Sequence, residues 1–71
     1  MKDKVNRSIL GINIKLFREK KGFSARQLSN ITGISESHIK NLESASANPS
    51  INTLVRIANS LDVSLDYLLK D

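Results

Sequence analysis

Apolar side chains recur at three- and four-residue intervals along almost the whole of this 71-residue chain, and strict alternation is rare. That spacing is the period of an α-helix with one face turned inward, and it predicts an all-α fold. A chain of this length has room for one hydrophobic core, so we expect a single domain over residues 1–71. Because the chain contains no cysteine, helix packing or a partner chain must supply its stability.

Start and stop signals divide the chain into five short helices. Ser24 and Gln27 form an S-x-x-Q capping box, and Ser35 is the expected N-cap of the next helix. Gly22 and Gly33 stand where a helix end or a turn favours a left-handed backbone. We predict helices over residues 7–21, 25–31, 36–43 and 51–61, and a fifth that begins at residue 65. The side chains expected to face the core are Leu10, Ile14, Phe17, Leu28, Ile34, Ile39, Leu42, Ile51, Leu54, Ile57, Ala58, Leu61, Leu65, Leu68 and Leu69.

Charge is unevenly distributed along the chain. Residues 1–40 carry nine Lys or Arg and three acids, whereas residues 41–71 carry two and four. One basic end suggests a polyanionic partner, although ordinary solubilising surface charge explains the same counts. No apolar run approaches the roughly 20 residues that span a bilayer, and the N-terminus is too polar for a signal peptide, so we expect a cytoplasmic protein with no membrane partner.

Two short helices joined through Gly33, the second with polar outward residues, follow the plan of a helix-turn-helix over about residues 24–43. The segments "LFREKKGFSARQLSNITGIS", "IKNLE" and "NPSINTLVRIANSLDVSLDYLL" occur in that order. With them the chain resembles the lambda-repressor-like, Cro/C1-type (XRE) helix-turn-helix domain from about Ile9 to Lys70. The resemblance implies a compact five-helix bundle that binds double-stranded DNA. It also implies a homodimeric bacterial or phage transcription regulator, associated with the nucleoid, with repression as the expected role.

In this family the third helix enters the major groove. With Ile39 and Leu42 set inward, a rotation of about 100° per residue turns Ser37 and Asn41 outward. By resemblance, Glu36, Ser37 and Asn41 occupy the positions that touch base edges. Asn41 could read adenine or be merely solvated, and Ser37 could contact DNA or serve the helix start. Glu36 could accept from cytosine or stabilise the helix dipole, and the residues do not decide between these roles.

Phosphate contacts are expected from the second helix and from the loops. Its first N–H groups, including that of Ala25, are natural phosphate donors. Arg26 can reach a phosphate at the exposed edge of this helix, and the alternative is a simple solvated charge. Further candidates are Lys40, Asn13, Ser44, Ser46 and Asn48. Two departures from the family reduce the number of expected phosphate contacts. Many members carry Gln in place of Ala25, and many carry Gly after the residue that is Glu43 here. The loop "SASANPS" also lacks charge, which implies a weaker salt-dependent term.

The resemblance also implies an ion pair between Arg18 and Glu43 that joins the first helix to the third. The alternative is two unrelated surface charges. Removing one partner of a buried pair would cost ~3 kcal/mol or more.

A second apolar stripe on the first helix bears on partner binding. It consists of Ile9, Ile12 and Leu16, and Tyr67 and Leu69 add apolar surface near the C-terminus. Cover by the fifth helix is the first expectation for this stripe, and a partner interface is the alternative. By resemblance we expect a homodimer near the fifth helix and the loop before the fourth, with reading helices roughly 34 Å apart on a near-palindromic operator.

Other function classes have less support. His38 is the single histidine, and the chain shows no clustered carboxylates and no glycine-rich phosphate loop, so no metal, cofactor or enzymatic activity is expected. Ala25 and the uncharged loop leave open a protein-interaction module that keeps the fold without binding DNA. The chain ends just after the fifth helix, so we expect no effector-binding domain.

Overall fold

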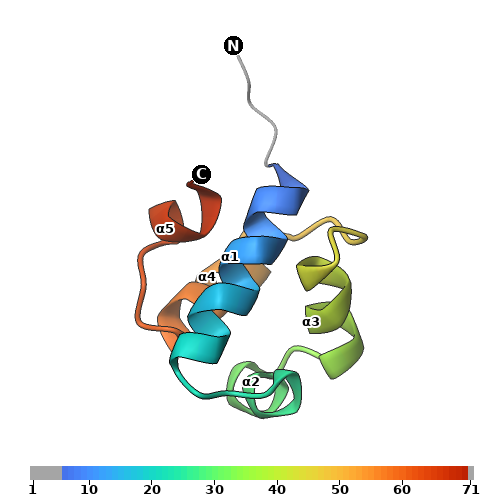
Figure 1. The fold of residues 1–71 in the computed structure, drawn as a ribbon. Helices are drawn as coiled ribbons and strands as arrows, with labels where there is room; N and C mark the ends of the chain where they lie inside the picture. The colour runs from blue at the N-terminus through green and yellow to red at the C-terminus, as the bar shows by residue number, and fades with distance from the viewer. Residues whose placement is uncertain (1–5, 71) are drawn as a thin grey trace.

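A computed structural model describes residues 6–70, and these residues form five helices and no strand. The helices are α1 (Arg7–Lys20), α2 (Ala25–Thr32), α3 (Glu36–Glu43), α4 (Ile51–Ser60) and α5 (Leu65–Leu69). In Figure 1, α1 runs through the middle of the molecule, α3 and α5 flank it on opposite sides, and α2 lies below its C-terminal end. The all-α prediction is confirmed, and each predicted helix end lies within one residue of the observed one.

Side-chain caps explain where the helices begin. The expected capping box is complete, since Ser24 Oγ accepts from the Gln27 N–H and Gln27 Oε1 accepts from the Ser24 N–H, at 3.0 and 2.8 Å. Ser35 Oγ accepts from the His38 N–H at 3.1 Å. Asn6 and Ser50 cap α1 and α4 in the same way, although neither was singled out from the sequence. Each cap satisfies an N–H group that would otherwise lack a partner.

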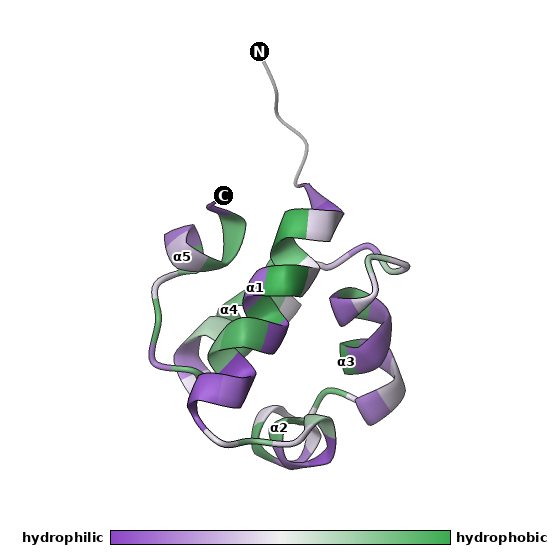
Figure 2. Cartoon of the chain, viewed as in Figure 1, coloured by the Kyte–Doolittle hydropathy of each residue, from purple (hydrophilic) through white to green (hydrophobic). Residues whose placement is uncertain are grey.

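The core lies where the apolar faces of all five helices meet. Its buried side chains are Leu10, Ile14, Leu28, Ile34, Ile39, Leu42, Leu54, Ile57, Ala58, Leu61 and Leu68. Phe17 and Leu65, also expected inside, are half-buried and pack against this core. The core therefore fixes α3 through Ile39 and Leu42. Figure 2 shows that the outer side of α3 is mostly hydrophilic.

Two residues that were predicted to face the core lie at the surface instead. Ile51 is 63% exposed and Leu69 is 38% exposed. Ile51 is the first residue of α4 and Leu69 the last of α5, so Ile51 has no preceding turn and Leu69 no following turn of its own helix to shield it. Helical periodicity gave the right phase in the helix interiors and the wrong burial at these two ends.

The second apolar stripe of α1 is not covered by α5, which contradicts the first expectation. Ile12 is 65% exposed and Leu16 is 46% exposed. The helix α5 packs on another side of α1, where the Phe17 and Tyr67 rings meet edge to face with centroids 6.4 Å apart. Ile12 and Leu16 therefore remain open to solvent, beside Lys15 and Glu19, while Ile9 is half-buried.

The backbone turns are left-handed at both expected glycines and at two other residues. Gly22 and Gly33 have φ of 76° and 77°, and Ala45 and Asp62 have φ of 65° and 57°. Ala45 follows α3 near the position where many family members carry glycine. A side chain at such a φ costs roughly 1–2 kcal/mol, so the chain keeps the turn geometry without the residue that suits it best.

Candidate nucleic-acid interface

The α2–α3 unit has the geometry of a helix-turn-helix. Gly33 ends α2 in the left-handed conformation, and its N–H donates to the Ser29 carbonyl at 2.9 Å. Ser35 then starts α3 two residues later. Leu28 of α2 and Ile34 of the turn are buried in the common core. This packing holds α3 at one edge of the molecule with one face toward solvent.

The exposed face of α3 gathers the expected base-reading side chains. Glu36, Ser37, Lys40 and Asn41 line one shallow hollow. Ser37 and Asn41 are exposed, and their side chains form no hydrogen bond with other residues in the range 6–70. Their hydroxyl and amide groups are therefore available to an external partner.

Glu36 has an interaction that the sequence analysis did not consider. Its carboxylate lies 3.2 Å from Lys40 Nζ, one helical turn away, with the two side chains 41% and 64% exposed. Such an exposed i,i+4 pair contributes about 0.3–0.5 kcal/mol. The spacing was visible in the sequence, because a Glu four residues before a Lys is the favoured order in a helix.

Some of the groups expected to bind phosphate have no hydrogen-bond partner among the described residues, and others already form hydrogen bonds within the fold. The Ala25 and Arg26 N–H groups open α2 and have no partner among the described residues, and the Arg26 and Asn48 side chains are exposed. The hydroxyls of Ser44 and Ser46 each donate toward the Asn41 carbonyl at 3.2 Å and contact each other at 2.9 Å. They therefore close the C-terminal end of α3, although both remain exposed.

The Asn13 side chain, one of the phosphate candidates, has hydrogen-bond partners within the fold. Its side-chain nitrogen donates to the Leu68 and Lys70 carbonyls at 2.9 and 2.7 Å. Both of its donor hydrogens are used in tying α1 to the end of α5.

Arg18 and Glu43 join α1 to the end of α3. Arg18 Nε lies 2.6 Å from one Glu43 carboxylate oxygen and Nη2 lies 3.0 Å from the other, while Nη1 donates to the Phe23 carbonyl at 2.8 Å. Both side chains are 11% exposed. The hydrogen bonds to Glu43 raise the pKa of Arg18, so they favour its charged form. This bidentate geometry fixes α3 in rotation as well as position.

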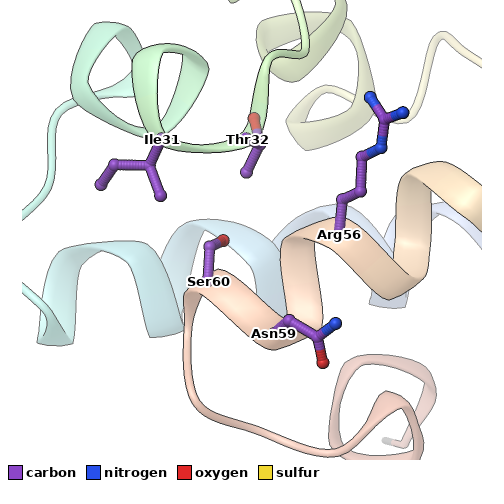
Figure 3. Close-up of a pocket in the computed structure, with 5 residues that line it drawn as sticks. All are labelled: Ile31, Thr32, Arg56, Asn59 and Ser60. Carbon is purple, nitrogen blue, oxygen red and sulfur yellow. The ribbon is translucent and has the colours of Figure 1, made fainter.

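A second hollow lies between α2 and α4, beside the helix-turn-helix. Figure 3 shows its lining residues, with Arg56 extending from α4. These residues are Ile31, Thr32, Arg56, Asn59 and Ser60. The Thr32 and Ser60 hydroxyls donate to carbonyls of their own helices, and Arg56 Nη1 lies 4.0 Å from where a Cβ on Gly33 would stand. The hollow thus offers one exposed cation beside the turn, which the sequence analysis did not single out.

Residues 6–70 contain neither a cluster of metal-ligating side chains nor a helix that could span a membrane. No group of three or more His, Cys, Asp or Glu among residues 6–70 is placed to hold a metal ion. None of the described helices has the length and apolar character needed to cross a bilayer.

Comparison with known proteins identifies the family. The HTH-type transcriptional regulator SinR of Bacillus subtilis (strain 168) is 34% identical over 64 residues, covering 89% of this chain and 58% of that protein. The uncharacterized HTH-type transcriptional regulator YqaE of the same strain is 40% identical over 58 residues, covering 82% of this chain and 50% of that protein. The chain thus spans little more than half the length of these relatives.

A solved structure has the same fold. The crystal structure of a hypothetical transcription factor, NHTF from Neisseria, superposes with a TM-score of 0.86 at 28% identity, covering 90% of this chain and 74% of that one. A family model described as helix-turn-helix, HTH_3, matches residues 14–68, which include all of α2, α3 and α4. By sequence and by fold, the chain belongs to the HTH_3 helix-turn-helix family.

Proposed function

We propose that this chain is a sequence-specific double-stranded DNA-binding module of a transcription regulator, which inserts α3 into the major groove. The observation that carries the proposal is the division of α3 into two faces. Ile39 and Leu42 are buried, while Ser37, Lys40 and Asn41 are exposed on the other side. The major groove is wide enough to admit an α-helix, so a helix held this way can bring its exposed hydrogen-bonding groups to the base edges. The relatives SinR and YqaE are named as transcriptional regulators, which supports the same conclusion.

Each side chain of the interface has a chemical role in this proposal. Asn41 can donate to adenine N7 and accept from its N6 amino group, and the Ser37 hydroxyl can contact a base edge or a phosphate. The Ala25 and Arg26 N–H groups at the start of α2, together with the Arg26 side chain, bind phosphate. Lys40, Asn48, Ser44 and Ser46 extend this backbone contact. Such a regulator would act as a repressor on nucleoid DNA in a bacterial cytoplasm by occupying an operator.

The salt dependence of DNA binding, measured for two substituted proteins, distinguishes phosphate contacts from base contacts. Binding to random duplex DNA is expected to weaken steeply as salt rises, and Arg26→Gln should reduce that slope by ~0.9 on every sequence. Asn41→Ala should instead cost about 1–3 kcal/mol on a site selected from a random pool and relax preference at one position. Fluorescence anisotropy at several salt concentrations measures both effects.

The same titration tests the alternative, a protein-interaction module without DNA binding. That alternative is favoured by Ala25, whose methyl group cannot clamp a phosphate, and by the uncharged loop over residues 44–50. A flat salt response of the unmodified chain would support the module and reject the DNA-binding proposal.

We also propose that the protein binds its operator as a homodimer through α4 and α5. Exposed apolar residues support this surface, because Ile51 and Val55 lie one turn apart on α4 at 63% and 42% exposure, and Tyr67 of α5 is 55% exposed. Two copies related by a two-fold axis would place their α3 helices about 34 Å apart on a near-palindromic site. Because Ile12 and Leu16 of α1 are also exposed, their surface is the rival one.

Sedimentation equilibrium distinguishes the two surfaces. The double substitution Ile51→Glu/Val55→Glu is expected to shift the protein to monomer, because it places four carboxylates at a two-fold interface. Ile12→Glu, at a residue that is 65% exposed, should leave the dimer intact. A protein that sediments as a monomer both with and without DNA would contradict the proposal.

A further inference from the structure

The Glu36–Lys40 pair places a carboxylate inside the surface that must approach DNA. Both residues line the hollow that also contains Ser37 and Asn41, the two expected base readers. The carboxylate lies 3.2 Å from Lys40 Nζ. A lone carboxylate at this position would be repelled by phosphates on either side of the groove, and a lone ammonium would be attracted by all of them. The pair offsets both effects while it is formed.

The positions of Glu36 and Lys40 along α3 favour their ion pair. Glu36 stands in the first turn of α3 and Lys40 in the last, so each charge also suits the helix dipole at its own end. When the ion pair opens, the two side chains remain anchored one helical turn apart. That separation is well inside the roughly 8 Å screening length of physiological salt, so the Glu36 carboxylate still offsets the charge of Lys40.

We propose that Glu36 is a specificity-determining residue that acts by withholding Lys40 from phosphates. The inference rests on the proposed DNA-binding function. A Lys40 that is already neutralised releases little counterion on meeting a phosphate, so it adds little to binding at arbitrary sequences. At a site that offers a cytosine amino group to the Glu36 carboxylate, that group can replace Lys40 as partner, and Lys40 is then released to the backbone. Non-specific affinity is thereby kept low relative to affinity for such a site.

A double-mutant cycle on the salt dependence of binding tests the inference. The probe is random-sequence duplex DNA, and the quantity measured is the slope of log affinity against log salt for four proteins. These are the unmodified chain, Lys40→Gln, Glu36→Gln and the double variant. In the Glu36→Gln background, Lys40→Gln should reduce the slope by ~0.9, which is about 3.5-fold in affinity between 200 and 50 mM salt. In the unmodified background the same substitution should reduce the slope by less than half as much.

Arg26→Gln is the matched control, measured in both Glu36 backgrounds. Arg26 is exposed at the start of α2 and takes part in no ion pair among residues 6–70, so its step of ~0.9 should be the same in both. All these side chains lie at the surface or half-buried on the reading face, and far-ultraviolet circular dichroism checks that each variant is folded.

The outcomes separate the two proposals. If Lys40→Gln reduces the salt slope equally in both backgrounds, Glu36 does not withhold Lys40 from phosphates. The DNA-binding function would not be affected by that result. A flat salt response in the unmodified protein would overturn the DNA-binding function, and this inference with it. Both proposals are supported if Lys40→Gln reduces the salt slope more in the Glu36→Gln background, and Arg26→Gln reduces it equally in both backgrounds.

Discussion

Replacement of Arg18 by glutamine is expected to lower the free energy of unfolding by ~3 kcal/mol or more. Two Arg18 nitrogens satisfy the two oxygens of the Glu43 carboxylate, and no other hydrogen bond to that carboxylate exists within residues 6–70. Both side chains are 11% exposed, so water cannot replace the lost partner fully. The substitution therefore leaves a largely desolvated charge without compensation. Urea denaturation near neutral pH, followed by circular dichroism, measures the loss.

Two further variants show whether the loss comes from a stranded charge. The double substitution Arg18→Met/Glu43→Met removes both charges, and it should recover most of the stability lost by Arg18→Gln. Lys21→Gln breaks the Lys21–Asp62 pair, whose atoms lie 2.5 Å apart but whose side chains are 37% and 75% exposed. This second pair is screened by water, so its loss should change stability by no more than ~1 kcal/mol. If Arg18→Gln costs no more than Lys21→Gln, the buried-pair interpretation is wrong.

The helix limits could be predicted from the sequence because their causes are local. A capping box needs only Ser24 and Gln27, three residues apart, and a helix end needs only a residue such as Gly22 or Gly33 that accepts positive φ. The orientation of α3 followed for the same reason, since Ile39 and Leu42 set the phase of an eight-residue helix. Which of its outward side chains touch DNA stays a prediction.

Burial and long-range partners could not be predicted in the same way. The periodicity of α1 shows two apolar stripes, but only the placement of α5 decides that Ile12 and Leu16 remain open. Asn13 bonds to carbonyls 55 and 57 residues away, so nothing near it in the chain signals its role. Ala45 conversely shows that a residue other than glycine can take a left-handed turn, because the surrounding packing outweighs the local cost.

The second large effect is expected at Gly11, where alanine should lower the free energy of unfolding by about 3 kcal/mol. A Cβ at this position would lie 2.6 Å from the carbonyl oxygens of both Leu42 and Glu43. These are backbone atoms at the end of α3, so they cannot rotate away as a side chain could. Relief requires α1 and α3 to separate, and that movement would also stretch the Arg18–Glu43 pair, which bridges the same two helices.

The sign of the Gly11→Ala effect is what makes the measurement informative. Gly11 lies in the interior of α1, where alanine is favoured over glycine by about 1 kcal/mol through helix propensity alone. A sequence reading therefore predicts stabilisation, and the close approach of α3 predicts the opposite. Gly22→Ala is the comparison: its Cβ would meet nothing within 4 Å, so only its φ of 76° opposes the change, at about 1–2 kcal/mol. A thermal or urea unfolding series that ranks Gly11→Ala below Gly22→Ala in stability would establish that backbone contact with α1 positions the end of the reading helix. A stabilised Gly11→Ala would show that this contact does not exist.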